Sequence, residues 1–248
     1  MTKMKKLASV LLAVVMAAGL MVPAFADTNN DGFLLGNNEF VASADVTKTE
    51  LEGGAVQYEF VRDEAVAPND MQQRNGTIQE RKKSVAAVIV FDEETENMVD
   101  ERIATIKNSL QGISVTATPE NPSSGWFFGD SLYMEIETFY TSTIIKNQTC
   151  CKITKVVTRT EVNSGTILNT AVLNVYALGV TPGTGTVNKE YEKNIKGLGN
   201  PYTCTEPNNW PYISNSGPML GAKLTCTARR SSGEVAGPFT VSDPVFVN

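Results

Sequence analysis

Apolar and polar residues alternate over long stretches of this chain, and this period of two is the feature that most limits its fold. In 222–228, alanine, leucine and cysteine occupy every second position, and lysine and threonine occupy the others. Such alternation is typical of a strand with one face in a core and the other toward solvent. Further strands are predicted along much of the chain: 85–91, 131–145, 151–162, 166–180 and a final extended segment ending at Val247.

Turn residues separate these strands. Asn163-Ser164-Gly165 lies between 151–162 and 166–180, which predicts a hairpin of these two strands. Four prolines fall within 186–218, which predicts a long irregular stretch. Sequential antiparallel strands with short turns favour a mainly β fold, either an antiparallel β-sandwich or a partly open barrel.

One stretch departs from the period of two and predicts an α-helix near residues 93–111. Its apolar stripe follows the i, i+4, i+7 spacing of a single helix face: Val99, Ile103 and Ile106. Asp92 and Thr95 are both placed to cap the start of this helix. We interpret the stripe as a face packed on the core.

The first 26 residues have the three parts of a secretory signal peptide. Three lysines precede an apolar run over 7–22, and Ala24-Phe25-Ala26 resembles a signal-peptidase site. The apolar run is shorter than the roughly 20 residues needed to span a bilayer. We therefore expect cleavage between Ala26 and Asp27, no membrane span afterwards, and a secreted bacterial protein, with the cell surface or a periplasm as alternatives.

Charge divides the remaining chain into two parts. Residues 27–80 hold eleven acidic and three basic residues, whereas 81–248 are nearly balanced. We expect 27–80 to be an acidic, loosely structured segment, with one hairpin of 46–51 and 55–61, and 81–248 to be a β-rich domain. Whether 27–80 is a pro-segment stays open.

Two bulk properties exclude whole classes of function. Without residues 1–26 the chain keeps 18 basic and 27 acidic residues, a net charge of −9, which disfavours nucleic acid as a partner. The sequence contains no histidine, so Ser-His-Asp, Cys-His and histidine-rich zinc sites are absent. No metal, cofactor or catalytic residue is predicted.

Two carboxylate patterns allow both a functional and a plainer structural interpretation. Residues 27–32 supply the oxygen ligands and glycine that open a calcium loop, but the twelfth position is Asn38, so we favour a polar mature start. Glu135 and Glu137 share one face of a predicted strand and could act as the acid pair of a glycoside hydrolase, which needs no histidine. The plainer interpretation is a solvated strand face.

Aromatic residues gather in two predicted loops and are the candidate binding residues: Trp126, Phe127, Phe128, Trp210 and Tyr212. Such loops can bind glycans or proteins, or their rings can close the ends of the core. We expect a secreted, non-enzymatic β-sandwich module that binds a surface, a glycan or an extracellular protein. The alternative is a carboxylate-based extracellular hydrolase of the glycoside type.

A minor alternative is a pore-forming or membrane-active protein. Residues 131–180 would then insert as a long hairpin, because such hairpins alternate apolar and polar residues. Basic residues interrupt the faces of this hairpin: Lys152, Lys155 and Arg159.

The four cysteines are expected to be oxidised outside the cell. Adjacent Cys150 and Cys151 should point to opposite faces of a strand, with Cys151 and Cys226 pointing inward. Cys204 would approach from the proline-rich loop. This geometry favours the pairs Cys151–Cys226 and Cys150–Cys204, although a register shift of one residue would exchange the partners.

Overall fold

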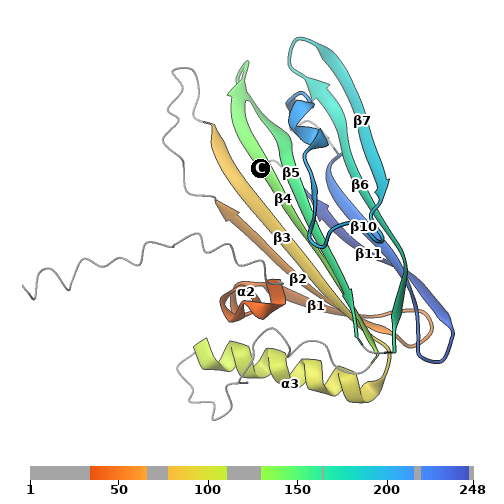
Figure 1. The fold of residues 1–248 in the computed structure, drawn as a ribbon. Helices are drawn as coiled ribbons and strands as arrows, with labels where there is room; N and C mark the ends of the chain where they lie inside the picture. The colour runs from red at the N-terminus through yellow and green to blue at the C-terminus, as the bar shows by residue number, and fades with distance from the viewer. Residues whose placement is uncertain (1–33, 66–77, 111–129, 164, 215–218, 246–248) are drawn as a thin grey trace, which may run out of the picture. The chain divides into compact units, whose positions relative to one another are not determined.

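The computed structural model describes residues 34–65, 78–110, 130–163, 165–214 and 219–245, and within them it contains two antiparallel sheets (Figure 1). The seven-stranded sheet contains β1 (Asp45–Glu50), β2 (Val56–Ala65), β3 (Gln79–Val90), β4 (Ser131–Ile145), β5 (Gln148–Val162), β8 (Tyr202–Cys204) and β9 (Ile213–Ser214). The four-stranded sheet has the order β11 (Val235–Pro244), β10 (Met219–Arg229), β6 (Ile167–Thr181) and β7 (Gly185–Asn194). The predicted mainly β fold is confirmed, and the sheets do not close into a barrel.

The main core lies between the two sheets. Leu132, Met134 and Ile136 of β4 point into it, as do alternate residues of β6 and β10. The pleat of a strand turns every second residue toward the other sheet, so these residues are buried. The apolar residues that recur with a period of two in the sequence are the residues on this inward face.

A second core covers the outer face of the seven-stranded sheet. It packs α2 (Asn38–Ser43) and α3 (Glu93–Leu110) against β2, β3 and the ring of Tyr133. Val99 and Ile106 of α3 are buried there, and the predicted helix is confirmed. Asp92 caps it, because its carboxylate accepts hydrogen bonds from the backbone N–H and the hydroxyl of Thr95, both at 2.8 Å.

The prediction that 27–80 is loosely structured is wrong for residues 34–65. These residues form η1 (Leu34–Gly36), α2 and the predicted β1–β2 hairpin, and β2 pairs with β3 over ten residues. The acidic composition was misleading because β2 buries Tyr58 and Phe60 in its first half and carries its charges mostly in its second half. Net charge does not report which positions of a strand are buried.

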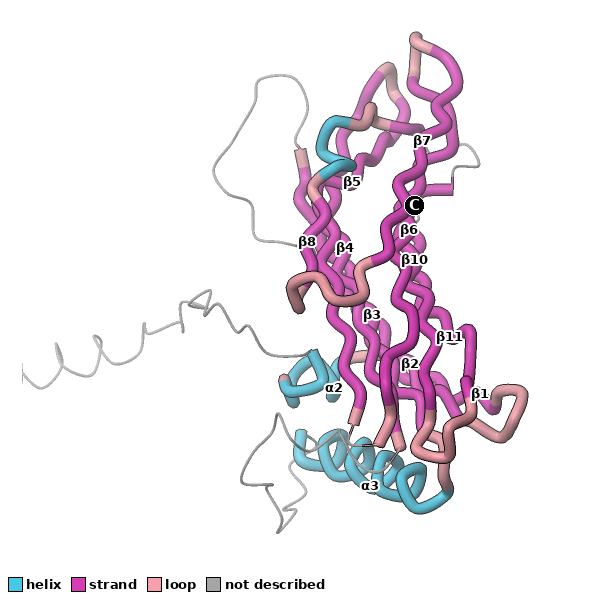
Figure 2. The backbone as a smooth tube through the Cα atoms, turned by 45° about the vertical axis from the view of Figure 1, so that its right-hand side comes forward, coloured by secondary structure: helices cyan, strands magenta, loops and turns pink. Residues whose placement is uncertain are grey.

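The predicted hairpin of 151–162 and 166–180 is also wrong, although both strands exist. β5 pairs with β4, β8 and β9, whereas β6 pairs with β10 and β7 in the other sheet. The chain reverses at the turn that contains Asn163 and Gly165 and crosses between the sheets (Figure 2). Turn residues signal a reversal of direction but do not select a hydrogen-bonding partner.

The stretch 186–218 is more regular than expected. It begins within β7 and contains β8, η2 (Glu206–Asn209) and β9. β7 is an edge strand whose residues are mostly exposed and polar, and only Val187 is buried. An exposed edge strand of this kind carries little apolar signal, since it has almost no inward residues to reveal it.

Candidate functional site

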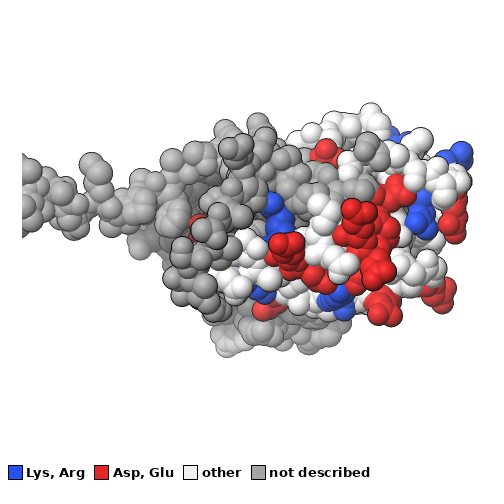
Figure 3. Space-filling view, turned by 90° about the horizontal axis from the view of Figure 1, so that it is seen from below, with Lys and Arg blue, Asp and Glu red and all other residues white. Residues whose placement is uncertain are grey.

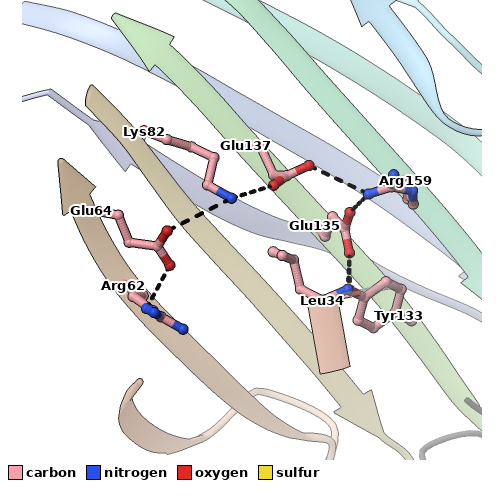
Figure 4. Close-up of polar contacts among 8 residues, drawn as sticks. All are labelled: Leu34, Arg62, Glu64, Lys82, Tyr133, Glu135, Glu137 and Arg159. Atoms are coloured by element: carbon pink, nitrogen blue, oxygen red, sulfur yellow. Dashed lines mark hydrogen bonds and ion pairs between the residues drawn. The ribbon is translucent and has the colours of Figure 1, made fainter. Parts of the chain in front are cut away.

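The two carboxylates of the hydrolase hypothesis lie on the outer face of the seven-stranded sheet (Figure 4). Glu135 and Glu137 share a face of β4, as predicted, and Glu135 lies opposite Arg159 of β5. Oε2 of Glu135 accepts hydrogen bonds from the Leu34 N–H, at 2.8 Å, and from the Tyr133 hydroxyl. Its Oε1 pairs with Nη1 of Arg159. Glu135 is therefore fully buried with both oxygens engaged.

Glu137 extends this contact into a row of alternating charges, which we call the charge ladder: Arg62, Glu64, Lys82, Glu137, Arg159 and Glu135. Arg159 Nη1 is 3.5 Å from Glu137 Oε2, and Lys82 Nζ is 3.3 Å from Glu137 Oε1. The row continues through Lys82 to Glu64, 4.0 Å away, and ends at Arg62. Side-chain exposure falls along it from 31% at Glu64 to 0% at Glu135, and Arg62 at the outer end is 25% exposed.

Burial dominates the electrostatics at the Glu135 end. Burial raises the pKa of Glu135, and the positive charge of Arg159 opposes this rise. Burial alone would lower the pKa of Arg159, but the facing Glu135 outweighs it and the pKa of Arg159 is raised. Arg159 thus favours the ionised form of Glu135, and Glu135 in turn stabilises the charge of Arg159.

This arrangement does not offer a general acid to a substrate. A catalytic carboxyl must come within hydrogen-bond reach of the bond that it protonates. Glu135 instead ties β4 to β5 and to the backbone of Leu34, and Glu137 joins β4 to β3 through Lys82. The carboxylate pair is best explained as a clamp that fastens the N-terminal segment to the sheet.

A different feature stands at the end of the sandwich away from α3, where the β4–β5 and β6–β7 turns lie (Figures 1 and 2). We call this the paired hairpin end and define it by Ile144–Lys146, Val180, Gly183 and Tyr212. The Lys146 ammonium of one turn lies over Gly183 of the other, so a side chain at position 183 would displace the ammonium. Gly183 also has a φ of 89°, which favours glycine.

Tyr212 links the β4–β5 hairpin to the β6–β7 hairpin close to their turns. Its hydroxyl is 3.0 Å from the hydroxyl of Thr141 in β4, and its backbone carbonyl accepts a 2.7 Å hydrogen bond from Thr181 in β6. The ammonium of Lys152 lies 5.1 Å from the centre of its ring, within cation–π range. One residue therefore links strands of both sheets.

Two large apolar side chains are exposed at this end. Ile144 is 64% exposed and Val180 is 44% exposed. Trp210, one of the candidate binding aromatics, is buried in the main core instead, and Tyr212 is partly covered. The remaining candidates, Trp126, Phe127 and Phe128, lie outside the described residues. The aromatic rings at 210 and 212 support this end, while aliphatic residues form its surface.

The opposite end of the sandwich, near α3, has a different surface (Figure 3). Acidic side chains outnumber basic ones in this view, and α3 exposes Glu93, Glu94, Asp100 and Glu101. Such a surface repels phosphate groups and anionic lipid heads.

The structure contains no disulfide bond among its four described cysteines, all of which are buried. Cys151 and Cys226 do point into the main core, where burial raises the pKa of each to about 12. Cys204 does not approach from outside: it is buried in β8 opposite Val156, six residues along β5 from Cys150. That spacing is about 20 Å, too far for a Cys150–Cys204 bond in this arrangement. The Cys151–Cys226 pair stays a prediction.

Within the part of the chain that the structure describes, no group of three or more acidic or cysteine side chains is placed to hold a metal ion. The calcium-loop pattern at 27–32 falls outside that part. No helix among the described residues is both long and apolar enough to cross a membrane.

Comparisons with family models, curated proteins and solved structures found no match to this chain. Sequence reasoning did not single out Ile144, Lys146 or Val180. The signal available for the first two was an Ile-Ile pair directly before Lys146-Asn147, since apolar residues next to a turn break the usual polar composition of turns.

Proposed function

We propose that this chain is an extracellular binding module that contacts a protein partner through the paired hairpin end. The observation that carries the proposal is the exposure of Ile144 and Val180 near the ends of β4 and β6, two strands that Tyr212 links beside their turns. Apolar side chains held on ordered strand ends can contact a partner with little loss of conformational entropy.

The chemistry of this end favours a protein as the partner. Ile144 and Val180 can be buried against apolar side chains, and Lys146 can pair with an acidic group at the rim. Glycan recognition would favour an exposed ring, but the ring of Tyr212 lies beneath Lys152. The signal-peptide pattern of the first 26 residues supports a role outside the cell.

Neither alternative function gains support from a specific contact. The hydrolase hypothesis needs an accessible carboxylate pair, and Glu135 is buried and ion-paired. The membrane-active hypothesis needs 131–180 to act as one hairpin, and these residues belong to two different sheets.

The proposal is tested with a pair of double variants. Ile144→Ser with Val180→Ser removes the apolar surface of the paired hairpin end. Ile167→Ser with Val235→Ser is the matched control, because these residues are 61% and 51% exposed elsewhere on the four-stranded sheet. Both variants should fold, as judged by circular dichroism.

Each tagged variant is then incubated with intact cells and with their secreted proteins, and bound protein is identified by mass spectrometry. We expect the wild type and the control to retain the same partner protein. The amount of this partner bound by the Ile144/Val180 variant should be at least tenfold lower. Equal retention by both variants would contradict the proposal. Binding to immobilised glycans or to lipid vesicles in place of protein would replace it with another class of partner.

A further inference from the structure

A buried lysine–aspartate contact joins the two sheets, and neither the charge ladder nor the paired hairpin end includes it. Lys83 of β3 and Asp243 of β11 face each other, with Nζ 3.3 Å from Oδ1. Asp243 lies on the same side of its strand as Val241 and Val245, which belong to the main core, and it is 0% exposed. The two residues therefore meet between the sheets and away from bulk water.

The environment of Asp243 disfavours its charge. Burial raises the pKa of Asp243 to about 6, and the nearby Lys83 opposes this rise. Thr138, which is also fully buried, lies on the neighbouring β4 and stabilises the charged form as well. Lys83 Nζ is further positioned by a 2.8 Å hydrogen bond that it donates to the carbonyl of Pro244. The amine is thus held beside a carboxyl group that gives up its charge readily.

We propose that Lys83 and Asp243 react with each other to form an intramolecular isopeptide bond between β3 and β11. A proton first passes from the Lys83 ammonium to the Asp243 carboxylate, which converts the ion pair into a neutral amine and a neutral acid. The amine nitrogen attacks Cγ of Asp243, and a nitrogen–carbon bond forms while a carbon–oxygen bond breaks. The departing hydroxyl takes the second amine proton and leaves as water, so atoms and charges balance without another reactant.

Two physical factors favour this step. Two reacting groups held about 3–3.5 Å apart react far faster than the same groups in dilute solution, since no encounter is needed. A buried ion pair retains a desolvation cost, and a neutral amide removes both charges from the core. Asp63 of β2 lies opposite Lys83 in the register, and its negative charge further raises the pKa of Asp243, which favours the neutral acid that the reaction needs.

The bond would fasten one edge strand of the four-stranded sheet to an inner strand of the seven-stranded sheet. β11 is hydrogen-bonded to β10 on one side only, and β3 lies between β2 and β4. The link thus holds an edge strand that the ladder secures along one side only.

The intact mass of the purified chain, with its N-terminus determined and its cysteines reduced and alkylated, tests this proposal. We expect the folded wild type to be one water molecule lighter than the mass calculated for that N-terminus with alkylated cysteines, and to give a branched peptide joining Lys83 to Asp243. Lys83→Arg and Asp243→Ala should keep their full masses. Asp243→Asn should lose one ammonia in place of water and reach the same linked mass as the wild type.

Lys82→Arg is the matched control, because Lys82 lies beside Lys83 but belongs to the charge ladder on the other face. It should lose one water as the wild type does. A folded wild type at full mass, with Lys83 and Asp243 recovered on separate peptides, would overturn the proposal. This result depends only on the wild type, so a variant that fails to fold does not affect it.

Discussion

Arg159→Met tests whether the charge ladder is a clamp rather than a catalytic pair. The substitution keeps a long apolar side chain but removes the cation that faces Glu135, which is fully buried. Breaking a buried pair by removing one partner costs about 3–5 kcal/mol. The Glu135 carboxyl can avoid an unpaired charge by binding a proton. Protonating a glutamate of ordinary pKa at pH 7 costs about 3.7 kcal/mol. Both routes predict a loss of about 3–4 kcal/mol in the free energy of unfolding.

The loss should depend on pH in a defined direction. Without Arg159 the folded-state pKa of Glu135 rises further above its unfolded value, so the folded protein binds more protons than the unfolded chain above about pH 4.3. The stability of Arg159→Met should therefore fall as the pH rises from about 4.5 toward 7. The wild type should show less of this fall, since Arg159 opposes the shift.

Urea unfolding, followed by tryptophan fluorescence and by circular dichroism at pH 5 and pH 7, measures this difference. Adding Glu135→Gln to Arg159→Met should restore most of the lost stability, because it removes the charge that was left unpaired. Lys193→Met on the exposed edge strand β7 is the control, with an expected change under about 0.5 kcal/mol. A loss below about 1 kcal/mol for Arg159→Met, or one independent of pH, would refute the clamp.

Three further predictions concern individual contacts and the leader. Asp92→Ala removes the cap that binds Thr95 and should lower the free energy of unfolding by about 1 kcal/mol in urea titrations. Tyr212→Phe loses the hydroxyl contact with Thr141, and it should cost about 1 kcal/mol and speed amide hydrogen exchange in the β4–β5 turn. N-terminal sequencing of secreted protein should begin at Asp27; an intact Met1 in the culture fluid would contradict cleavage.

The sequence predicted most of the elements that a local period can reveal. α3 was found because its apolar residues follow one helix face, and Asp92 was found as a cap because it stands directly before that face. β4, β5, β6 and β10 were found because their inward residues alternate with polar ones. These features depend only on residues that are close to one another in the sequence.

What escaped prediction depends on contacts between distant residues. The reversal at Asn163 and Gly165 was visible, but the choice of β10 as the partner of β6 is made by residues some 50 positions later. Glu135 was expected on a solvated or catalytic face, because nothing near it in sequence shows that Leu34 covers it. The exposure of Ile144 likewise follows from where the hairpins end in space.

Site-specific photo-crosslinking tests the binding proposal most directly. A benzophenone amino acid is placed at Ile144 in one protein and at Ile167, at the opposite end of β6 from Val180, in another. After irradiation with partner-containing cell material, we predict a covalent protein adduct from position 144 and none from position 167. The same adduct from both positions, or one from position 167 alone, would contradict binding through the paired hairpin end.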